Sequence, residues 1–331
     1  MSQFLSNCSA SAVADAAANI LAGNLVAFPT ETVYGLGADA CNADAVARIY
    51  SVKGRPADHP LIVHVASMDA LGDWASDVPA YAILLARDFW PGPMTLVMKR
   101  SALAGDFVTG GQDTVGIRVP DHGVALGLLD AFARAGGKGV AAPSANRFGN
   151  VSPTTAQAVS DELSDYLGEA DQILDGGPCE VGVESTIIDC TGDVPRILRP
   201  GAVTIVMIEE STGLGVGDSV ATIGSAVDEE QIRVSGSLDS HYAPVAKVVL
   251  DQSPVAGQGF IAMADIATPD GVVRLAAPKT HDEFARVLYA ALRAADEQKL
   301  QAVVVVQPQG DGIAFAIRDR LVRSSNKREI C

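Results

Sequence analysis

The chain has 331 residues, of which 48% are hydrophobic and 19% are charged, a composition that excludes a disordered or fibrous protein. Its length favours two domains. No apolar stretch approaches the roughly 18 residues needed to cross a bilayer, and no basic segment precedes an apolar one at the N-terminus. We therefore expect no membrane span, no secretory signal and a cytoplasmic location.

Acidic residues outnumber basic ones by 40 to 24, which gives a formal net charge of -16. Such a surface repels polyphosphates at long range, so extended nucleic-acid binding is not expected. The five cysteines are odd in number and show no C-x-x-C spacing. This argues against a disulfide framework or a zinc cage.

Residues 1–208 are predicted to form an α/β domain, because short apolar runs alternate with helical patterns. A helix N-cap is expected within residues 152–154, and the loop before it would face a helix N-terminus, where anions commonly bind. The expected strands are residues 25–28, 61–65, 94–98 and 140–142, and the expected helices lie near 42–52, 79–89 and 154–163.

Residues 209–240 are rich in Gly, Ser and acidic residues, and residues 209–244 are predicted to form a linker. Residues 245–331 return to an α/β pattern with apolar runs typical of a buried parallel sheet. This indicates a smaller, Rossmann-like second domain. Its expected strands are residues 246–250, 259–263, 272–276 and 302–306, and its expected helices are 281–298 and 313–323.

Several common catalytic motifs are absent from the sequence. There is no P-loop, no complete G-x-G-x-x-G, no H-E-x-x-H and no G-x-S-x-G. These absences exclude P-loop nucleotide binding, zincin chemistry and an α/β-hydrolase triad.

The segment KGRPADHPLIVH at residues 53–64 places Lys53 and Arg55 at the predicted end of a helix. Cations there can complement the helix dipole, or they can bind an oxyanion. Pro56 stops the helix, so both side chains are predicted to point into a cavity, which favours an oxyanion ligand.

Residues 28–37, FPTETVYGLG, bring two threonine hydroxyls, an acid and a tyrosine into a predicted strand-to-helix turn. These groups could cap the helix or bind a small ligand. Arg118 lies inside an apolar strand, where an unpaired guanidinium is costly. It is predicted to meet an acid, either a structural Asp or Glu or the carboxylate of a substrate.

The segment AAPSANRFGNVS at residues 141–152 leaves a strand and enters small polar residues. Ser144, Asn146 and Ser152 could be turn formers or phosphate ligands. Residues 182–188 and 196–201 are interpreted as strands that end in polar residues.

Five motifs in this order closely resemble the YrdC-type family of threonylcarbamoyl-AMP synthases: PTETVYGL (29–36), KGRP (53–56), PSAN (143–146), ESTI (184–187) and RPG (199–201). The resemblance covers nearly all of residues 10–208. The segment SLDSHYAP (237–244) and the DRL at 319–321 look like the long form of the family, which carries an additional C-terminal domain.

The resemblance implies an open twisted sheet with a concave face. It also implies that L-threonine, bicarbonate and ATP become threonylcarbamoyl-AMP and pyrophosphate, a nucleotidyl transfer. A separate transferase complex would then modify tRNA, while direct tRNA binding by this chain would be weak or absent. Mg²⁺ would accompany ATP and be held mainly by the phosphates and water, so no metal-binding residues are expected.

Site residues follow from the matching motifs. Lys53 and Arg55 would be catalytic, through positioning and charge neutralisation. The family usually has Asn where this chain has His59, which would then replace an amide beside ATP. The threonine contacts would be Thr32, His64, Arg118, Ala142 and Ser185, and the ATP contacts Lys53, Arg55, His59, Thr114, Ser144, Asn146, Ser152, Arg199 and Tyr242.

Tyr242 lies where the linker regains an aromatic residue and a proline. Residues 209–244 are therefore predicted to fold back as a lid over the cleft, with packing of Tyr242 at the entry to the second domain as the alternative. Two other functions remain open from the sequence. One is a non-catalytic RNA-binding module of the same fold, against which the net charge of -16 argues. The other is a carbamoyl transferase, although the acylphosphatase and zinc-finger parts that accompany such domains have no counterpart here.

Overall fold

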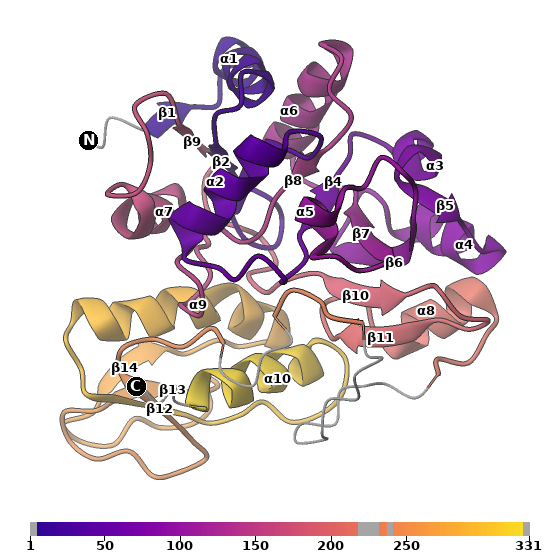
Figure 1. The fold of residues 1–331 in the computed structure, drawn as a ribbon. Coiled ribbons are helices and arrows are strands. Elements are labelled where there is room, and N and C mark those ends of the chain that lie inside the picture. Colours follow the sequence, from indigo (N-terminus) through magenta and orange to yellow (C-terminus); the bar gives the residue numbers. More distant parts are fainter. Residues whose placement is uncertain (1–4, 218–231, 237–240, 327–331) are drawn as a thin grey trace.

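The computed structural model describes residues 5–217, 232–236 and 241–326. Figure 1 shows two bodies stacked on one another, with the N-terminal two thirds of the chain in one and the orange and yellow C-terminal elements in the other. The prediction of a large open sheet followed by a smaller α/β domain is confirmed.

The first domain is built on an eleven-stranded mixed sheet within the described residues. Strand β5 (Ala75–Asp77) pairs with β6, off the main path. The strand order is β1 (Leu5–Asn7), β9 (Gln172–Asp175), β2 (Val26–Phe28), β3 (Gly35–Asp39), β8 (Val140–Ala141), β4 (Ile62–His64), β7 (Thr114–Arg118), β6 (Met94–Arg100), β10 (Thr186–Asp189) and β11 (Arg196–Arg199).

Helices cover this sheet (Figure 1). Buried apolar residues from the helices and strands, including Trp74 and Ile117, form its main core. The helices are α1 (Ala10–Leu21), α2 (Ala43–Lys53), α3 (Leu71–Trp74), α4 (Ala80–Phe89), α5 (Asp106–Thr109), α6 (Gly123–Arg134), α7 (Ala156–Leu163) and α8 (Ile205–Thr212), with a 3₁₀ turn at Met68–Ala70.

Local sequence explains where α2 begins and ends. The Asn42 side chain caps its first turn, and Gly54 terminates it in a left-handed conformation with φ of 61°. Lys53 is therefore the last helical residue, and Arg55 follows the Gly54 cap. The two cations leave the helix in different directions, which matters for the site.

Three details of the sequence-based picture are wrong. The segment after β2 leads to a strand, because β2 and β3 pair antiparallel and the threonine-rich residues form the turn between them. The cap of α7 is Thr155, one residue beyond the predicted range of 152–154. The boundary placed at residue 208 falls inside α8, which continues to Thr212.

In the described part of the second domain, the sheet has four strands and every pair is parallel, as predicted. Its order is β12 (Lys247–Leu250), β15 (Ala302–Val305), β13 (Gly259–Ile261) and β14 (Val273–Ala276). Two helices, α9 (His281–Glu297) and α10 (Ile313–Ser325), pack on it.

One buried cluster joins the two domains. Val33, Val151 and Val183 of the first domain pack with Phe284 and Leu288 of α9, and all five are buried. In Figure 1, α9 lies along the boundary between the two bodies. Burial of apolar surface therefore fixes the second domain against the loops that leave the large sheet.

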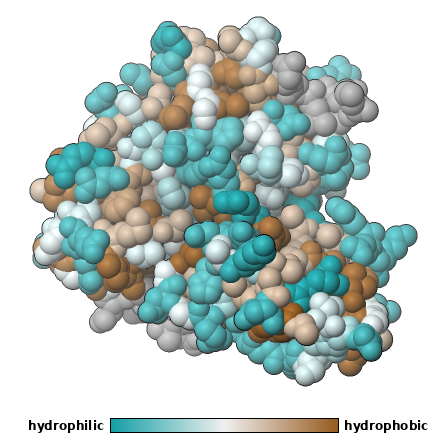
Figure 2. Space-filling view, turned by 180° about the vertical axis from the view of Figure 1, so that it is seen from behind, coloured by the Kyte–Doolittle hydropathy of each residue, from teal (hydrophilic) through white to brown (hydrophobic). Residues whose placement is uncertain are grey.

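On the face shown in Figure 2, hydrophilic and hydrophobic residues alternate in small groups. Within the described ranges, the helices are too short or too polar to cross a bilayer. Cys8, Cys41, Cys179 and Cys190 are free thiols, and Cys331 lies outside the described residues.

Candidate active site

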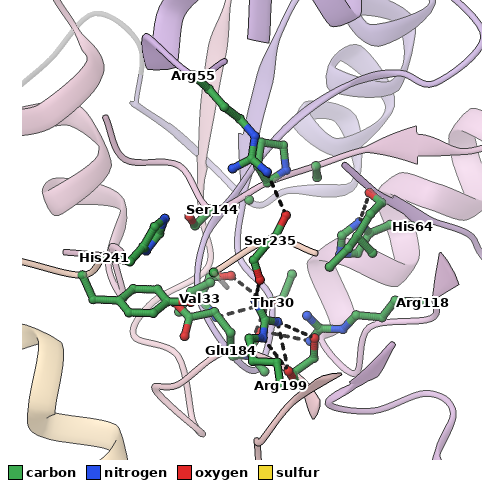
Figure 3. A pocket seen from close by; sticks show the side chains of 18 residues that line it. Thr30, Val33, Arg55, His64, Arg118, Ser144, Glu184, Arg199, Ser235 and His241 are labelled. Atoms are coloured by element: carbon green, nitrogen blue, oxygen red, sulfur yellow. Dashed lines mark hydrogen bonds between the residues drawn. The ribbon is translucent and has the colours of Figure 1, made fainter. Parts of the chain in front are cut away.

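A cavity lies where loops from the large sheet meet the segment that leads to the second domain (Figure 3). Its walls come from the β2–β3 turn, the strands β4 and β7, the loop after β8, and residues near β10 and β11. The lining residues are Thr30, Thr32, Val33, Gly35, Arg55, Ile62, His64, Arg118, Ala142, Pro143, Ser144, Glu184, Ser185, Arg199, Ser235, Gly236, His241 and Tyr242.

Two buried guanidinium groups, Arg55 and Arg199, contribute positive charge to this cavity. Their hydrogen bonds within the described residues go to neutral oxygens: Arg55 donates to the Pro60 carbonyl at 2.9 Å, and Arg199 donates to the Ser185 carbonyl at 2.9 Å. Burial lowers the pKa of Arg55 to about 10, so it remains charged at neutral pH. Such cations suit an anionic ligand.

Ser235 connects these two arginines (Figure 3). Its hydroxyl accepts from Arg55 Nη2 at 3.0 Å, and its carbonyl accepts from Arg199 Nη1 at 2.9 Å. The segment between the domains therefore reaches the cavity and bonds to both Arg55 and Arg199.

A third arginine, Arg118, lies at the end of β7 and is also buried. Its Nη2 lies 2.6 Å from Glu31 Oε1 and donates to Thr32 Oγ1 at 2.9 Å. The predicted acid partner is thus a structural one, Glu31. The Nε of Arg118 is buried and has no acceptor among the described residues, which leaves a donor for a ligand.

His64 lies beside Arg118 in the cavity wall (Figure 3). Burial, reinforced by the charge of Arg118, lowers the pKa of His64 to about 3. The imidazole is therefore neutral at physiological pH, so one of its nitrogens donates a hydrogen bond and the other accepts one.

Glu184 is the only carboxylate among the described residues that line the cavity. Burial alone would raise its pKa, but Arg320, Arg199 and the Ser152 hydroxyl lower it to about 2. The side chain is therefore anionic, and its oxygens are held by protein donors.

His241 lies on the side of the cavity opposite His64 (Figure 3), and Tyr242 also lines the cavity. Burial lowers the pKa of His241 to about 3, and its Nδ1 has no hydrogen-bond partner within the described residues. Tyr242 is buried, stacks on Tyr289 with ring centroids 5.7 Å apart, and adopts a φ of 60°.

The structure brings most of the predicted site residues together. Those that line the cavity are Thr32, Arg55, His64, Arg118, Ala142, Ser144, Ser185, Arg199 and Tyr242, from both the predicted threonine set and the predicted ATP set.

The prediction that both cations of the KGRP segment point into the cavity is correct for Arg55 and wrong for Lys53. The Lys53 ammonium is buried and donates to the carbonyls of Ser144 and Asn146. Burial and the nearby charge of Arg55 lower the pKa of Lys53 well below its usual value. Lys53 thus supports the loop that presents Ser144 to the cavity.

Four other predicted ATP contacts also lie outside the lining. Thr114 begins β7 and borders a different hollow, which residues 233–235 also line. Asn146 donates to carbonyls of its own loop, and Ser152 donates to Glu184 Oε1 at 2.6 Å. His59 packs its ring edge-on against Phe148, with centroids 5.3 Å apart.

The sequence reasoning missed Glu31, Glu184, Ser235 and His241 as individual site residues, although three of them lie in or beside recognised motifs. The position of Glu184 directly before an apolar strand predicts a partner for its carboxylate, because a buried charge without a partner is costly. Ser235 carried no signal, because its position depends on how the linker folds.

A profile of the Sua5, YciO and YrdC proteins, described as "Telomere recombination", matches residues 18–201. A second profile, described as the C-terminal domain of threonylcarbamoyl-AMP synthase, matches residues 203–326. Together they span most of the chain.

Curated relatives match over nearly their full length. The threonylcarbamoyl-AMP synthase of Pyrococcus abyssi is 39% identical over 338 residues, which is 95% of this chain and 94% of the relative. The Bacillus subtilis synthase is also 39% identical, over 96% of this chain and 94% of its own. The crystal structure of P. abyssi Sua5 complexed with L-threonine matches with a TM-score of 0.87 and 36% identity over 97% of both chains. The chain therefore belongs to the threonylcarbamoyl-AMP synthase family.

Proposed function

We propose that this protein is a threonylcarbamoyl-AMP synthase that uses L-threonine, bicarbonate and ATP. The observation that carries the proposal is the arrangement of Arg55 and Arg199, two buried cations bonded only to neutral oxygens within the described residues of one cavity. The threonine-bound structure of P. abyssi Sua5, at 36% identity, supports threonine as one substrate.

In this proposal threonine occupies the side of the cavity that holds Arg118, Thr32 and His64. The threonine carboxylate would accept from Arg118, whose Nε is unpartnered within the described residues. Neutral His64 would supply a hydrogen bond without adding charge beside the amino group that must react.

The reaction joins three molecules and releases two. The threonine nitrogen bonds to the carbon of bicarbonate, and water leaves. An oxygen of the resulting carbamate then bonds to the α-phosphorus of ATP. The bond between the α-phosphorus and the bridging oxygen breaks, and its electrons leave with pyrophosphate. The reaction is thus a nucleotidyl transfer to a carbamate oxygen.

No protein nucleophile is required, so the chain acts by positioning its substrates and by neutralising charge. Arg55 and Arg199 would bind the phosphates. Mg²⁺ would accompany ATP and be held mainly by the phosphates and water. Glu184 would not be needed as a metal ligand, because its oxygens are already bonded to Ser152, Tyr289 and Arg320.

We also propose that the described part of the 209–244 segment acts as a lid. Ser235, Gly236, His241 and Tyr242 line the same cavity as Arg118, and Ser235 bonds to both phosphate-binding candidates. A covered cavity would limit the access of water to a labile adenylate.

The product would pass to a separate complex that transfers the threonylcarbamoyl group to tRNA in the cytoplasm. The net charge of -16 supports weak or absent direct tRNA binding by this chain.

The test is pyrophosphate release with threonine, bicarbonate or ATP omitted in turn. We expect release only when all three are present, together with a product that contains carbon from labelled bicarbonate. Undiminished release without threonine would refute the proposal.

A further inference from the structure

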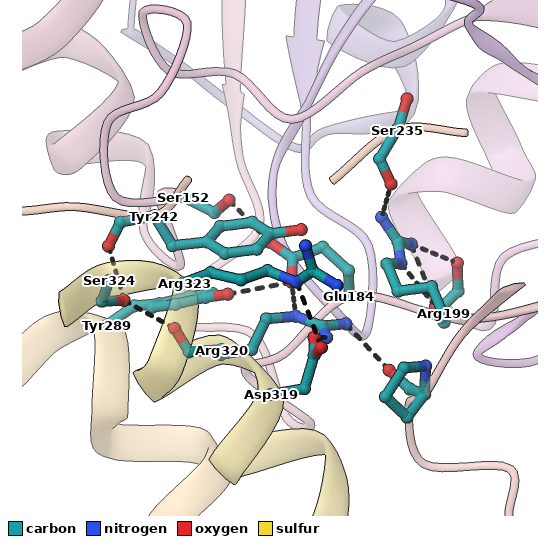
Figure 4. Close-up of polar contacts among 12 residues, drawn as sticks. Ser152, Glu184, Arg199, Ser235, Tyr242, Tyr289, Asp319, Arg320, Arg323 and Ser324 are labelled. Atoms are coloured by element: carbon teal, nitrogen blue, oxygen red, sulfur yellow. Dashed lines mark hydrogen bonds and ion pairs between the residues drawn. The ribbon is translucent and has the colours of Figure 1, made fainter. Parts of the chain in front are cut away.

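Arg320, on α10 of the second domain, forms an ion pair with the first domain behind the cavity wall (Figure 4). Its Nε lies 2.8 Å from Glu184 Oε2, and its side chain is 0% exposed. Glu184 lines the cavity and Arg320 does not. The pair therefore connects the core of the second domain to the surface that faces the substrates.

Glu184 is held on both oxygens. Ser152 Oγ donates to Oε1 at 2.6 Å, and Tyr289 Oη donates to Oε2 at 2.9 Å, beside Arg320. Arg320 in turn is held by Asp319, whose Oδ2 accepts from Nη1 at 2.5 Å. The carboxylate thus has a fixed orientation and one directly bonded cation.

Arg320 also contacts two other parts of the cavity wall. Its Nη2 donates to the carbonyl of Pro200 at 2.9 Å, next to Arg199, and its guanidinium lies 5.3 Å from the centre of the Tyr242 ring. Ser324, one turn further along α10, donates to the Tyr242 carbonyl at 2.9 Å. These contacts hold Tyr242 at its φ of 60°, a conformation that residues other than glycine rarely adopt.

The charges show what Arg320 does for the cavity. Glu184 and Arg199 line the same cavity and interact electrostatically. A buried carboxylate without a counter-ion is costly, so a Glu184 deprived of Arg320 would be compensated by the next cation, Arg199. Arg199 is bonded only to neutral oxygens of Ser185 and Ser235 within the described residues, so it could accept that role.

We propose that Arg320 is a positioning residue whose charge neutralises Glu184 and so leaves Arg199 uncompensated for the phosphates of ATP. The inference rests on the proposed function. It assigns the second domain a part in nucleotide affinity, although none of its described residues beyond 244 lines the cavity.

A double-mutant cycle tests this proposal in the full-length protein. Its variants are Arg320→Met, Glu184→Gln and the combination of both, and its readouts are the KM values for ATP and for threonine together with the melting temperature. We expect Arg320→Met alone to raise the ATP KM about tenfold or more and to change the threonine KM less than about threefold, because loss of one charged interaction has that size.

The decisive comparison is made in a chain that already carries Glu184→Gln. There the carboxylate charge is gone, so adding Arg320→Met should change the ATP KM by less than about threefold. An equal tenfold effect with and without Glu184→Gln would overturn the proposal. If Arg320→Met alone does not fold, Arg320→Gln takes its place in the cycle, because the effect on the ATP KM must be compared with and without the carboxylate.

Arg323→Met is the matched control, because Arg323 lies on the same helix and its side chain pairs with Asp319 at 3.1 Å. It should lower the melting temperature slightly and leave the ATP KM unchanged. An increase as large as that for Arg320→Met would assign the effect to helix packing and overturn the proposal. A wild-type protein that releases no pyrophosphate from ATP would refute the proposed function itself, whereas an active wild type with a failed cycle refutes only the role of Arg320.

Discussion

Arg118 and Glu31 form a buried ion pair in which Arg118 Nη2 lies 2.6 Å from Glu31 Oε1. Their side chains are 5% and 6% exposed. The carboxylate is fixed further by the backbone N–H of Asp121, which donates to its Oε2 at 3.1 Å. Glu31 therefore holds Arg118 in place on one side, while the Nε of Arg118 remains unpartnered within the described residues.

Replacement of Arg118 by alanine should raise the threonine KM about 10- to 100-fold, since loss of a charged hydrogen bond costs about 1.5 to 3 kcal/mol. The ATP KM should change far less, because Arg55 and Arg199 remain. The melting temperature should also fall, because Glu31 is left buried without its cation. Steady-state kinetics with each substrate varied in turn, and thermal unfolding, provide the measurements.

The variant Glu31→Gln separates the two effects of that substitution. It keeps an acceptor for the Asp121 N–H and removes the charge, so the threonine KM should rise by a smaller factor than in Arg118→Ala. A threonine KM unchanged in Arg118→Ala, together with a lower melting temperature, would assign Arg118 a purely structural role.

Gly236 tests whether the segment over the cavity affects nucleotide binding. Its φ is +82°, and an added Cβ would lie 2.1 Å from the Tyr242 hydroxyl and 3.3 Å from Arg199 Nη1. Gly236→Ala must therefore displace the segment, and we expect the ATP KM to rise about three- to tenfold. Gly215→Ala is the matched control, because no atom lies within 4 Å of its added Cβ. Equal ATP KM values for the two variants would contradict a lid.

The sequence predicted much of this site because its chemistry is carried by short motifs. Arg118 could be predicted to meet an acid, since its strand is otherwise apolar. The identity of that acid could not be predicted, because Glu31 reaches Arg118 only after the β2–β3 turn has folded.

Lys53 and Arg320 show two other limits of the sequence. Lys53 and Arg55 are two residues apart, and only the left-handed turn at Gly54 sends them in different directions. Arg320 is one of several charged residues on an amphipathic helix, and it becomes buried only when the second domain docks on Glu184. Docking between domains leaves no periodic signal in either segment.

The two buried histidines of the cavity should make the protein sensitive to acid. Burial lowers the pKa of both His64 and His241 to about 3, whereas the unfolded chain titrates near 6.5. Between these values the unfolded state binds protons that the folded state does not. The neutral histidines therefore contribute their full stabilisation above about pH 6.5, and this contribution is lost as the pH falls towards 3. Between pH 7 and pH 5 the free energy of unfolding should fall by about 2 kcal/mol per histidine.

Urea unfolding at pH 7 and pH 5 measures this loss, and the histidine variants assign it. His64→Asn and His241→Asn should each lose less stability on acidification than the wild type. His281→Asn, at the start of α9 and outside the cavity, controls for the replacement of a histidine. If both cavity variants lost as much stability between pH 7 and pH 5 as the wild type, neither histidine would be neutral in the folded protein.

His59 stands where the motif resemblance leads us to expect asparagine, and substitutions distinguish two ways in which it can act. Its ring packs against Phe148, and the Arg55 guanidinium lies 5.5 Å from the centre of the same Phe148 ring. This arrangement favours packing support for Arg55 over a direct hydrogen bond to ATP. His59→Phe should then leave the ATP KM near the wild-type value, whereas His59→Ala and His59→Asn should raise it about two- to tenfold, the size of an aromatic pair. The reverse order, with Asn equal to wild type and Phe impaired, would establish a hydrogen-bonding role for His59 beside ATP.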